Sequence, residues 1–436
     1  MKPPEELPET YNSGIRFSSD GADCSVPLAI DSRNFCTFKC VYCFGQNLMR
    51  NPDRNPALRQ KKQLSIKRLE KFLNRELKDP VSLAAYPLLD AGVPVQLGAL
   101  GDSFDETELV TTWAKQAIPL FRKYRVPVRI GTKGGRVLQL PEYLRLFEND
   151  SDMFWFAFSI ICNDDDLVSK IDIRAPVTSE RLRAMSLLTK LGCKASLRFR
   201  PFLPGVSDTF PGGPPNAWEV LIDRCHEAGA RAISYEWLFL NRNNTPRQES
   251  LNQHLFEKMG NPNFGEYWKK NSPKESAMRG KKLDKYEMTM RIKEKVLGLG
   301  WTFGISDPHY REENTTFSCC AFPDHDPWFG KYNRDQLTRV LVEGRRAYDE
   351  GRPWSVTFSD WVPDWAKKIK KRMCVSLGDA HTHKKYQYQT IADDWRNKWN
   401  NPNKARGPEI YFRESLVPTG TDEATGDLIY EYQPWV

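Results

Sequence analysis

The feature that most constrains this chain of 436 residues is a group of three cysteines within eight residues. Cys36, Cys40 and Cys43 occur in the run Cys-Thr-Phe-Lys-Cys-Val-Tyr-Cys, at spacings of four and three residues. Thiols this close in the sequence cannot pair with one another without strain, and their odd number leaves one over. Thiolates from one loop suit a soft metal centre, and three of them on a four-iron cluster leave one iron free. A zinc knuckle that lacks a ligand, or three unrelated core cysteines, are the alternatives.

Composition indicates a globular chain with 40% hydrophobic and 12% aromatic residues. Its length exceeds the usual limit of a single core, so we expect one large domain with an appended one. No apolar run reaches membrane-spanning length, and the first residues lack the apolar core of a signal peptide. The seven other cysteines show no regular spacing, which fits a reducing compartment. We therefore expect a soluble, cytoplasmic protein without a membrane partner.

Apolar runs typical of strands alternate with helical spacings over most of the chain. Strands are expected at 26–30, 93–100, 128–132, 154–161, 195–200, 232–240 and 301–305. Helices of this length between strands predict parallel βαβ units with right-handed crossovers. Seven candidate strands in this length favour an α/β fold, an open and partial TIM-type barrel of the (β/α)6 kind, over a doubly wound sheet.

The same pattern predicts how the chain is divided. Residues 1–25 read as an irregular arm, 26–310 as the partial barrel and 311–436 as a basic, aromatic C-terminal extension. A polar stretch rich in asparagine and lysine, 241–280, reads as an insertion over one face of the barrel. In barrels of this type the functional side chains gather at the carboxyl ends of the strands.

The C-terminal extension carries an uneven positive charge. Between Lys331 and Arg406 there are 17 lysines and arginines against 9 aspartates and glutamates, an excess equal to the net charge of +8 of the whole chain. Five tryptophans lie in the same segment: Trp354, Trp361, Trp365, Trp395 and Trp399. Cations interleaved with aromatics suit a phosphate backbone and stacked bases, whereas the alternative is a solvated helix face with tryptophans in a small core.

One short run in this segment concentrates the charge. It comprises Lys367, Lys368, Lys370, Lys371 and Arg372. Like charges this close on a helix repel one another, and an anionic partner relieves them. We expect this basic run to contact nucleic-acid phosphates, with Trp361 and Trp365 packing or stacking nearby.

The cysteine spacing, with Tyr42 just before the third thiol, resembles the radical S-adenosylmethionine (SAM) superfamily. The resemblance implies that Cys36, Cys40 and Cys43 hold a [4Fe-4S] cluster whose free iron chelates the amino and carboxylate groups of SAM. It also implies reductive cleavage of SAM to a 5′-deoxyadenosyl radical that abstracts hydrogen. An external electron donor such as a flavodoxin or a ferredoxin is then required.

Further motifs at the strand ends are similar to one branch of that superfamily, the spore photoproduct lyase and DNA repair photolyase-like proteins. The segments that carry this similarity are 97–108, 131–133, 174–182 and 200–205, together with Ser159. The resemblance implies that SAM is bound by Tyr42, Gly101, Asp102, Ser103, Lys133, Ser159 and Arg200.

The chain departs from that branch in the loop after the second predicted strand. Spore photoproduct lyases carry a hydrogen-donor cysteine there, whereas this chain has Gly98-Ala-Leu-Gly-Asp102 and no thiol. The vicinal pair Cys319 and Cys320, after the last predicted strand, is the substitute: a hydrogen donor or a ligand to a second metal. The alternative is that both are small buried hydrophobic side chains.

The resemblance therefore favours a radical SAM enzyme of isomerase or lyase type that abstracts hydrogen from a thymine-derived base in DNA. Related bacteriophage proteins take part in thymidine hypermodification, so we expect rearrangement of a modified base, or repair, by a phage-encoded protein in the host cytoplasm. Such a base has to be flipped out of its stack to reach the barrel. The alternatives are a radical SAM enzyme acting on a peptide or small metabolite, and a non-enzymatic iron–sulfur or zinc module that binds nucleic acid.

Overall fold

An open sheet of eight strands, in the order β1 to β8, forms the centre of the molecule. The computed structural model describes residues 7–17, 24–43, 60–209, 212–238, 253, 257, 283–369, 390–402 and 415–434. The strands are β1 (Ile15–Phe17), β2 (Leu28–Ile30), β3 (Val95–Leu97), β4 (Val128–Thr132), β5 (Phe154–Ser159), β6 (Lys194–Phe202), β7 (Ala232–Trp237) and β8 (Thr302–Ile305). All neighbours from β2 to β8 are parallel. The predicted partial, open barrel is confirmed, and β8 adds a seventh parallel strand to a six-unit barrel.

The first strand corrects one expectation from the sequence. Within the arm that was predicted to be irregular, β1 pairs antiparallel with β2, and Ile15 lies opposite Ile30. Ile15 and Phe17 are buried on one side of β1, and Arg16 between them forms an ion pair with Asp31 at 3.0 Å. An alternation over three residues is too short to be distinguished from irregular chain in a sequence. The predicted insertion, 241–280, lies outside the described residues except for Gln253 and Glu257.

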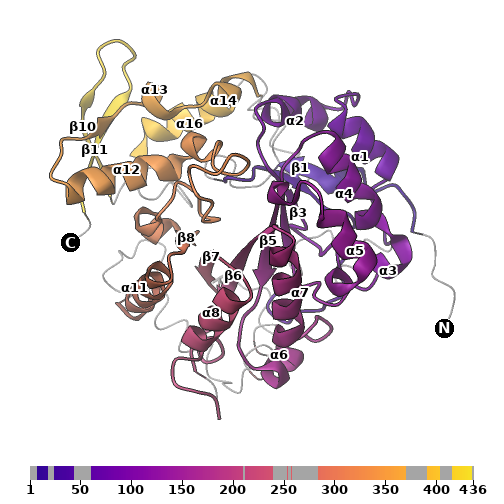
Figure 1. Cartoon of the computed structure of the whole chain (residues 1–436). Helices are drawn as coiled ribbons and strands as arrows, with labels where there is room; N and C mark the ends of the chain where they lie inside the picture. The colour runs from indigo at the N-terminus through magenta and orange to yellow at the C-terminus, as the bar shows by residue number, and fades with distance from the viewer. Residues whose placement is uncertain are drawn as a thin grey trace.

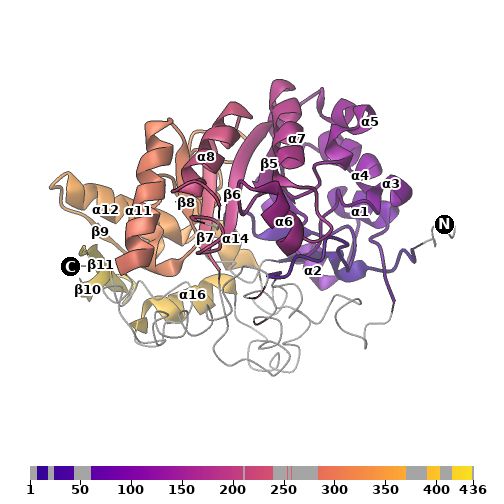
Figure 2. The same ribbon diagram turned by 90° about the horizontal axis from the view of Figure 1, so that it is seen from below.

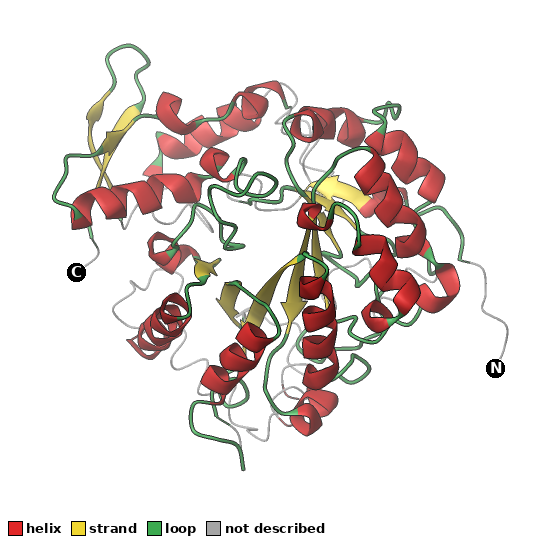
Figure 3. Cartoon of the chain, viewed as in Figure 1, coloured by secondary structure: helices red, strands yellow, loops and turns green. Residues whose placement is uncertain are grey.

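Helices cover the outer side of the sheet (Figures 1 and 3). They are α1 (Ile66–Leu73), α2 (Pro80–Asp90), α3 (Glu108–Thr111), α4 (Trp113–Lys123), α5 (Pro141–Leu144), α6 (Asp165–Ile171), α7 (Thr178–Lys190), α8 (Ala217–Glu227) and α11 (Leu283–Gly298). Figure 2 shows α7, α8 and α11 side by side along the sheet. Connections of this kind bring the carboxyl ends of the parallel strands to one edge.

The two faces of the sheet differ in chemistry because successive side chains of a strand point to opposite sides. In β4, Val128 and Ile130 are buried in the main hydrophobic core with the helices. Arg129 lies between them in the sequence and therefore points to the inner face. Its register partner is Trp155 of β5, which packs within a different cluster of buried residues. The outer face is thus apolar, whereas the inner face carries polar and charged residues.

A segment that follows β8, residues 316–329, crosses the inner face. The ring of Trp155 lies 4.9 Å from that of Phe322, and Thr302 Oγ1 donates a hydrogen bond to the carbonyl oxygen of Ala321 at 2.6 Å. A Cβ at position 304 would lie 2.7 Å from the Ala321 nitrogen. Glycine at position 304 therefore allows the segment to lie directly on β8.

In the described residues of the C-terminal part, a small antiparallel sheet and four α-helices lie at one side of the barrel (Figure 1, orange to yellow). These elements are α12 (Leu337–Asp349), β9 (Ser355–Val356), α13 (Phe358–Trp361), α14 (Asp364–Lys368), α16 (Ile391–Trp399), β10 (Leu416–Thr421) and β11 (Leu428–Tyr432). Their buried residues belong to the same contiguous core as those of the barrel. In the part of the chain that is described, no helix is long and apolar enough to cross a membrane.

The tryptophans of this part form a packed core. The ring of Trp361 stacks at 5.3 Å on that of Trp395 and at 5.8 Å on that of Trp399. Trp365 contacts Trp395 edge to face at 5.5 Å, and its indole nitrogen donates to Asp335 at 3.2 Å. Trp361, Trp365, Trp395 and Trp399 are all at most 7% exposed. For these four residues the core interpretation is confirmed, and of the two roles expected for Trp361 and Trp365, packing or stacking on bases, the structure shows packing.

Candidate functional site

The three-cysteine loop begins directly after β2, at the carboxyl end of the first parallel strand. Cys36, Cys40 and Cys43 lie in one small cluster that also contains Phe38 and Tyr42. Cys40 is buried, the other two thiols are partly exposed, and none of the three forms a disulfide bond. The loop therefore brings its three sulfur atoms to one place at the edge where this fold gathers functional groups.

Hydrogen bonds to the next loop fix one side of the cysteine loop. The backbone N–H and hydroxyl of Thr37 donate to Asp105 Oδ2 at 3.0 and 2.9 Å. Asp105 in turn forms a fully buried ion pair with Arg33 at 2.8 Å. A carboxylate that accepts several hydrogen bonds and faces a guanidinium is held rigidly. Arg33 and Asp105 thus position the loop between Cys36 and Cys40.

Hydrogen bonds to the segment after α6 fix the other side. The Val41 N–H donates to the carbonyl oxygen of Ile171 at 3.0 Å, and the Arg174 N–H donates to that of Phe38 at 3.0 Å. Cys40 also forms an isolated antiparallel bridge with Asp172. The cysteine loop is therefore bound on both sides by the parallel-strand scaffold.

The donor set fits an iron–sulfur cluster. Burial, followed by the nearby Asp105 and Asp102, raises the pKa of the Cys36 thiol to about 12, and burial and Asp172 raise the pKa of Cys40. A metal centre bound here would therefore displace protons from these thiols. Among the described residues, no three histidine, cysteine, aspartate or glutamate side chains are placed to hold a single metal ion. In a four-iron cluster each thiolate binds a different iron. Three thiols that are not placed around a single ion can therefore still bind one cluster, because the cluster is larger than an ion.

A buried charged group lies beside the thiols. Asp172 and Arg181 form an ion pair at 2.8 Å with both side chains fully buried, and Lys133 Nζ lies 5.2 Å from the centre of the Tyr42 ring. Burial alone would lower the pKa of Lys133, but Asp172 and the Cys40 thiol raise it. Burial would raise the pKa of Asp172, but Lys133 and Arg181 outweigh it and lower that pKa. The site therefore holds a cationic ammonium group next to Tyr42 and Cys40.

The loop after β3 is joined to the end of β4. Asp102 accepts hydrogen bonds from Thr132 Oγ1 at 2.9 Å, from the Lys133 N–H at 2.6 Å and from the Phe104 N–H at 2.9 Å. Burial raises the pKa of Asp102 to about 6, although the hydrogen bonds from Lys133 and Phe104 oppose this shift. The carboxylate predicted to contact SAM thus also fixes the backbone of Lys133.

The neighbours of Asp102 contact the cysteine loop. A Cβ at Gly101 would lie 2.7 Å from the carbonyl oxygen of Phe35, so only glycine allows this approach. The Ser103 hydroxyl donates to the Ser32 hydroxyl at 3.0 Å. The structure therefore brings the predicted residues Gly101, Asp102, Ser103 and Lys133 next to the three-cysteine loop.

The predicted residues of β5 and β6 lie on the inner face. Ser159 Oγ accepts a hydrogen bond from Arg198 Nη1 at 3.1 Å. Arg200 donates from Nε to Glu236 at 3.0 Å and from Nη1 to Ser234 Oγ at 3.1 Å. Arg198 is a residue that the sequence analysis missed. The signal that could have found it is the alternation Arg198-Phe-Arg200, which places two cations on one face of a strand.

The vicinal cysteines lie in the segment that crosses the inner face. Cys319 and Cys320 are both buried, and the Cys319 carbonyl oxygen accepts a hydrogen bond from Ser234 Oγ at 3.2 Å. A hydrogen bond from Cys319 lowers the pKa of the Cys320 thiol. Burial opposes this shift, whereas the positive charges of Arg129 and Arg200 lower the pKa further. The pair thus lies close to arginines of β4 and β6.

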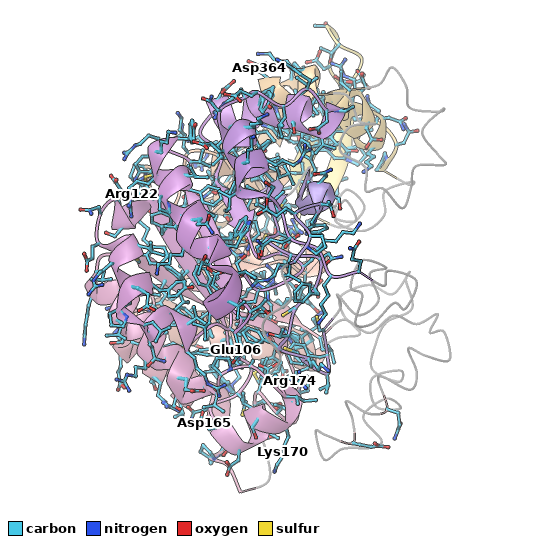
Figure 4. All side chains as sticks on the ribbon, turned by 90° about the vertical axis from the view of Figure 1, so that its right-hand side faces the viewer. Glu106, Arg122, Asp165, Lys170, Arg174 and Asp364 are labelled. Carbon is cyan, nitrogen blue, oxygen red and sulfur yellow. The ribbon has the colours of Figure 1, made fainter. Side chains whose placement is uncertain are left out.

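Two residues of the basic run are described, and both are exposed at the end of α14. Lys367 Nζ forms an ion pair with Asp364 at 2.9 Å, and Lys368 is exposed beside it. Lys370, Lys371 and Arg372 lie outside the described residues. In Figure 4, Asp364 and Arg174 lie toward opposite ends of the molecule, and Arg174 binds the cysteine loop. The start of the basic run and the three-cysteine loop are therefore well separated.

No protein-family model and no curated protein sequence matches the chain. Solved structures do match, among them a spore photoproduct lyase double mutant with bound AdoMet and dinucleoside spore photoproduct. It has 14% identity and a TM-score of 0.42, over 58% of this chain and 65% of that chain. Streptococcus suis SuiB bound to precursor peptide SuiA has 13% identity and a TM-score of 0.32, over 52% of this chain and 44% of that chain.

These matches cover less than two thirds of either solved chain. Their identities and TM-scores are too low to assign a function. The site itself combines an open parallel barrel with three thiols on a loop after its first parallel strand.

Proposed function

We propose that this chain is a radical SAM enzyme in which Cys36, Cys40 and Cys43 hold a [4Fe-4S] cluster. The observation that carries the proposal is the convergence of three thiols from one loop at the carboxyl edge of the parallel sheet. When bound, the cluster and SAM supply a 5′-deoxyadenosyl radical, which abstracts a hydrogen atom from the substrate.

The residues around the loop have distinct roles in this proposal. The ammonium group of Lys133, next to Tyr42 and Cys40, attracts the carboxylate of SAM. Asp172 and Arg181 keep that ammonium charged and in place. Asp102 orients it through the backbone, and the absence of a side chain at Gly101 lets the loop after β3 lie against the cysteine loop.

The proposed substrate is a thymine-derived base in DNA, modified by rearrangement or repair. The 5-methyl or 5-methylene carbon of thymine carries hydrogens that require a radical for their removal. The loop after β3 has no thiol, so hydrogen returns to the product from 5′-deoxyadenosine in a rearrangement. Cys319 or Cys320 is the alternative hydrogen donor, with its thiyl radical reduced by the external electron donor. Lys367 and Lys368, exposed at the start of the basic run, supply phosphate contacts.

A second candidate substrate is a peptide or small metabolite. The burial of Trp361, Trp365, Trp395 and Trp399 favours it, because these rings are enclosed in the core. Base stacking is a main source of affinity for single-stranded nucleic acid, so the burial of these rings removes one argument for DNA.

Anaerobic reconstitution with iron and sulfide tests the proposal. The wild type should show the visible absorption of a four-iron cluster and, with a reductant, convert SAM into 5′-deoxyadenosine. Replacement of Cys36, Cys40 and Cys43 by alanine should abolish both signals. Cys225→Ala is the matched control, because Cys225 is a buried cysteine of α8 outside the loop.

Each failure has a separate meaning. Cluster absorption that survives the triple replacement contradicts the ligand assignment. A cluster that forms without 5′-deoxyadenosine favours a non-enzymatic iron–sulfur module. Mass spectrometry of DNA nucleosides from cells with and without the protein then separates the two substrates: a new thymine-derived nucleoside supports DNA, and unchanged nucleosides support a peptide or metabolite.

A further inference from the structure

Three arginines of the inner face form a group that the proposed radical chemistry does not use. Arg129 belongs to β4, and Arg198 and Arg200 belong to β6. The pKa of Arg198 is lowered to about 10, mainly by burial and then by the positive charges of Arg200 and Arg129. The three guanidinium groups therefore influence one another. Arg198 also influences Lys133, which connects this arginine group to the surroundings of the three-cysteine loop.

Arg129 has bonding capacity that the described protein does not satisfy. Its side chain is 4% exposed, and its Nη1 donates to Gln96 Oε1. Its Nε and Nη2 have no hydrogen-bond partner among the described residues. Leaving a buried donor without an acceptor costs about 1–3 kcal/mol, and more when the donor is charged. A buried guanidinium with two donors unpaired among the described residues therefore indicates an acceptor that those residues do not supply.

Within the described part of the chain, the arginine group has little compensating negative charge. Glu236 accepts from Arg200, but its side chain is 41% exposed and thus partly screened by solvent. The Cys320 thiol lies near Arg129 and Arg200, yet it accepts no hydrogen bond from the free donors of Arg129. The other acceptors of these arginines among the described residues are uncharged: the Ser159 hydroxyl and the Arg200 carbonyl oxygen accept from Arg198, and the Ser234 hydroxyl accepts from Arg200.

We infer that Arg129, Arg198 and Arg200 bind an oxyanion carried by the substrate, a carboxylate or a phosphate group. Guanidinium groups present paired N–H donors that match the oxygens of both anions, and such charge-assisted bonds are among the strongest in proteins. This inference rests on the proposed function, because it identifies the substrate of that site as an anion. It also gives Arg200 a contact with substrate in place of the predicted contact with SAM.

Calorimetric titration of the full chain tests the inference without iron or SAM. Inorganic phosphate and acetate are the probes, with ionic strength kept constant by potassium chloride. At least one probe should bind the wild type, and Arg129→Met and Arg198→Gln should weaken that binding by about 10- to 100-fold, as expected for removal of a charge-assisted hydrogen bond. Arg183→Gln, on the exposed side of α7, removes the same charge elsewhere and should leave affinity within about twofold.

Thermal unfolding distinguishes an arginine that binds an anion from one that only supports the fold. The midpoint of the wild type should rise with the concentration of the bound probe, because a ligand stabilises the state that binds it. The midpoint of Arg129→Met should not respond. The result that overturns the inference is the absence of any response of the wild type to both anions, or an equal response of wild type and Arg129→Met.

A second pair of probes identifies the source of the anion. If thymidine 5′-monophosphate binds and thymidine does not, the anion that the arginines bind is the phosphate of a nucleotide. If acetate binds more tightly than phosphate, it is a carboxylate. A chain that binds anions but forms no cluster contradicts only the proposed function, whereas one that cleaves SAM but ignores both anions contradicts only the inference.

Discussion

The carboxylate of Asp102 accepts a hydrogen bond from the backbone N–H of Lys133 at 2.6 Å. This bond joins the loop after β3 to the end of β4, and it lies directly behind the ammonium group that faces Tyr42. The proposed SAM contacts of the two strands are therefore coupled. A change at Asp102 should affect the site through the position of Lys133 as well as through its own charge.

Asp102 should make stability depend on pH. Its pKa is raised to about 6 in the folded chain, so between about pH 4 and pH 6 the unfolded state has released a proton that the folded state keeps. At low pH, protonated Asp102 therefore adds up to about 3 kcal/mol to the free energy of unfolding. This contribution is lost as the pH rises through 6. The free energy of unfolding of the wild type, relative to Asp102→Asn, should therefore fall between pH 4 and pH 7 in urea denaturation.

The substitution at Asp102 also removes an acceptor, which adds a constant difference at every pH. Only the change of the difference with pH tests the argument. Asp166→Asn, at an exposed position of α6, is the control for removal of a carboxylate. A difference between wild type and Asp102→Asn that is the same at pH 4 and pH 7 would contradict the shifted pKa.

Lys133 should contribute to the affinity for SAM but not to the iron content of the protein. Lys133→Ala removes the ammonium group beside Tyr42 and Cys40, so the affinity for SAM should fall by about 10- to 100-fold. Iron and sulfide content should match the wild type, because the three thiols remain. Lys190→Ala, exposed on α7, is the control. Anaerobic titrations in which Lys133→Ala binds SAM like the wild type would show that this lysine has another role.

The sequence was sufficient for features that depend on local patterns. Periodic apolar residues located the strands from β2 to β8, and the thiol spacing located the loop after β2. Two features on the inner face depend on contacts between distant segments. Residues 316–329 return to cover β7 and β8, and Arg129 and Arg198 come together only when β4 and β6 share a face. No spacing within one segment encodes such an arrangement.

The tryptophans show the same limit. Composition alone could not separate a stacking surface from a core, because both contain aromatics among cations. The structure separates them through pairs such as Trp361 and Trp395, which are distant in sequence and in contact.

Trp361 should therefore contribute to stability more than to binding. Its side chain is 3% exposed, and replacement by alanine leaves a cavity between Trp395 and Trp399. Trp361→Ala should reduce the free energy of unfolding by about 3–5 kcal/mol, and Trp361→Phe should reduce it less. Denaturant unfolding measures both. A stability equal to that of the wild type would mean that this ring does not pack in the core.

The basic run should control binding to DNA if the proposed substrate is correct. Lys367 and Lys368 are exposed at the end of α14, and the one ion pair of Lys367 among the described residues is with exposed Asp364. Reversing both charges, with Lys367→Glu and Lys368→Glu, should weaken DNA binding. It should also reduce the slope of log affinity against log salt by about 0.9 for each phosphate that the protein no longer neutralises, or roughly two units.

Reversal of Lys170 and Lys190, exposed on α6 and α7, is the control for net charge. Cleavage of SAM without substrate should be unchanged in the double variant, because Asp364 lies far from Arg174 in Figure 4, and the Arg174 N–H donates a hydrogen bond to the cysteine loop. An unchanged salt slope would instead favour a peptide or small-metabolite substrate, for which phosphate binding at α14 has no role.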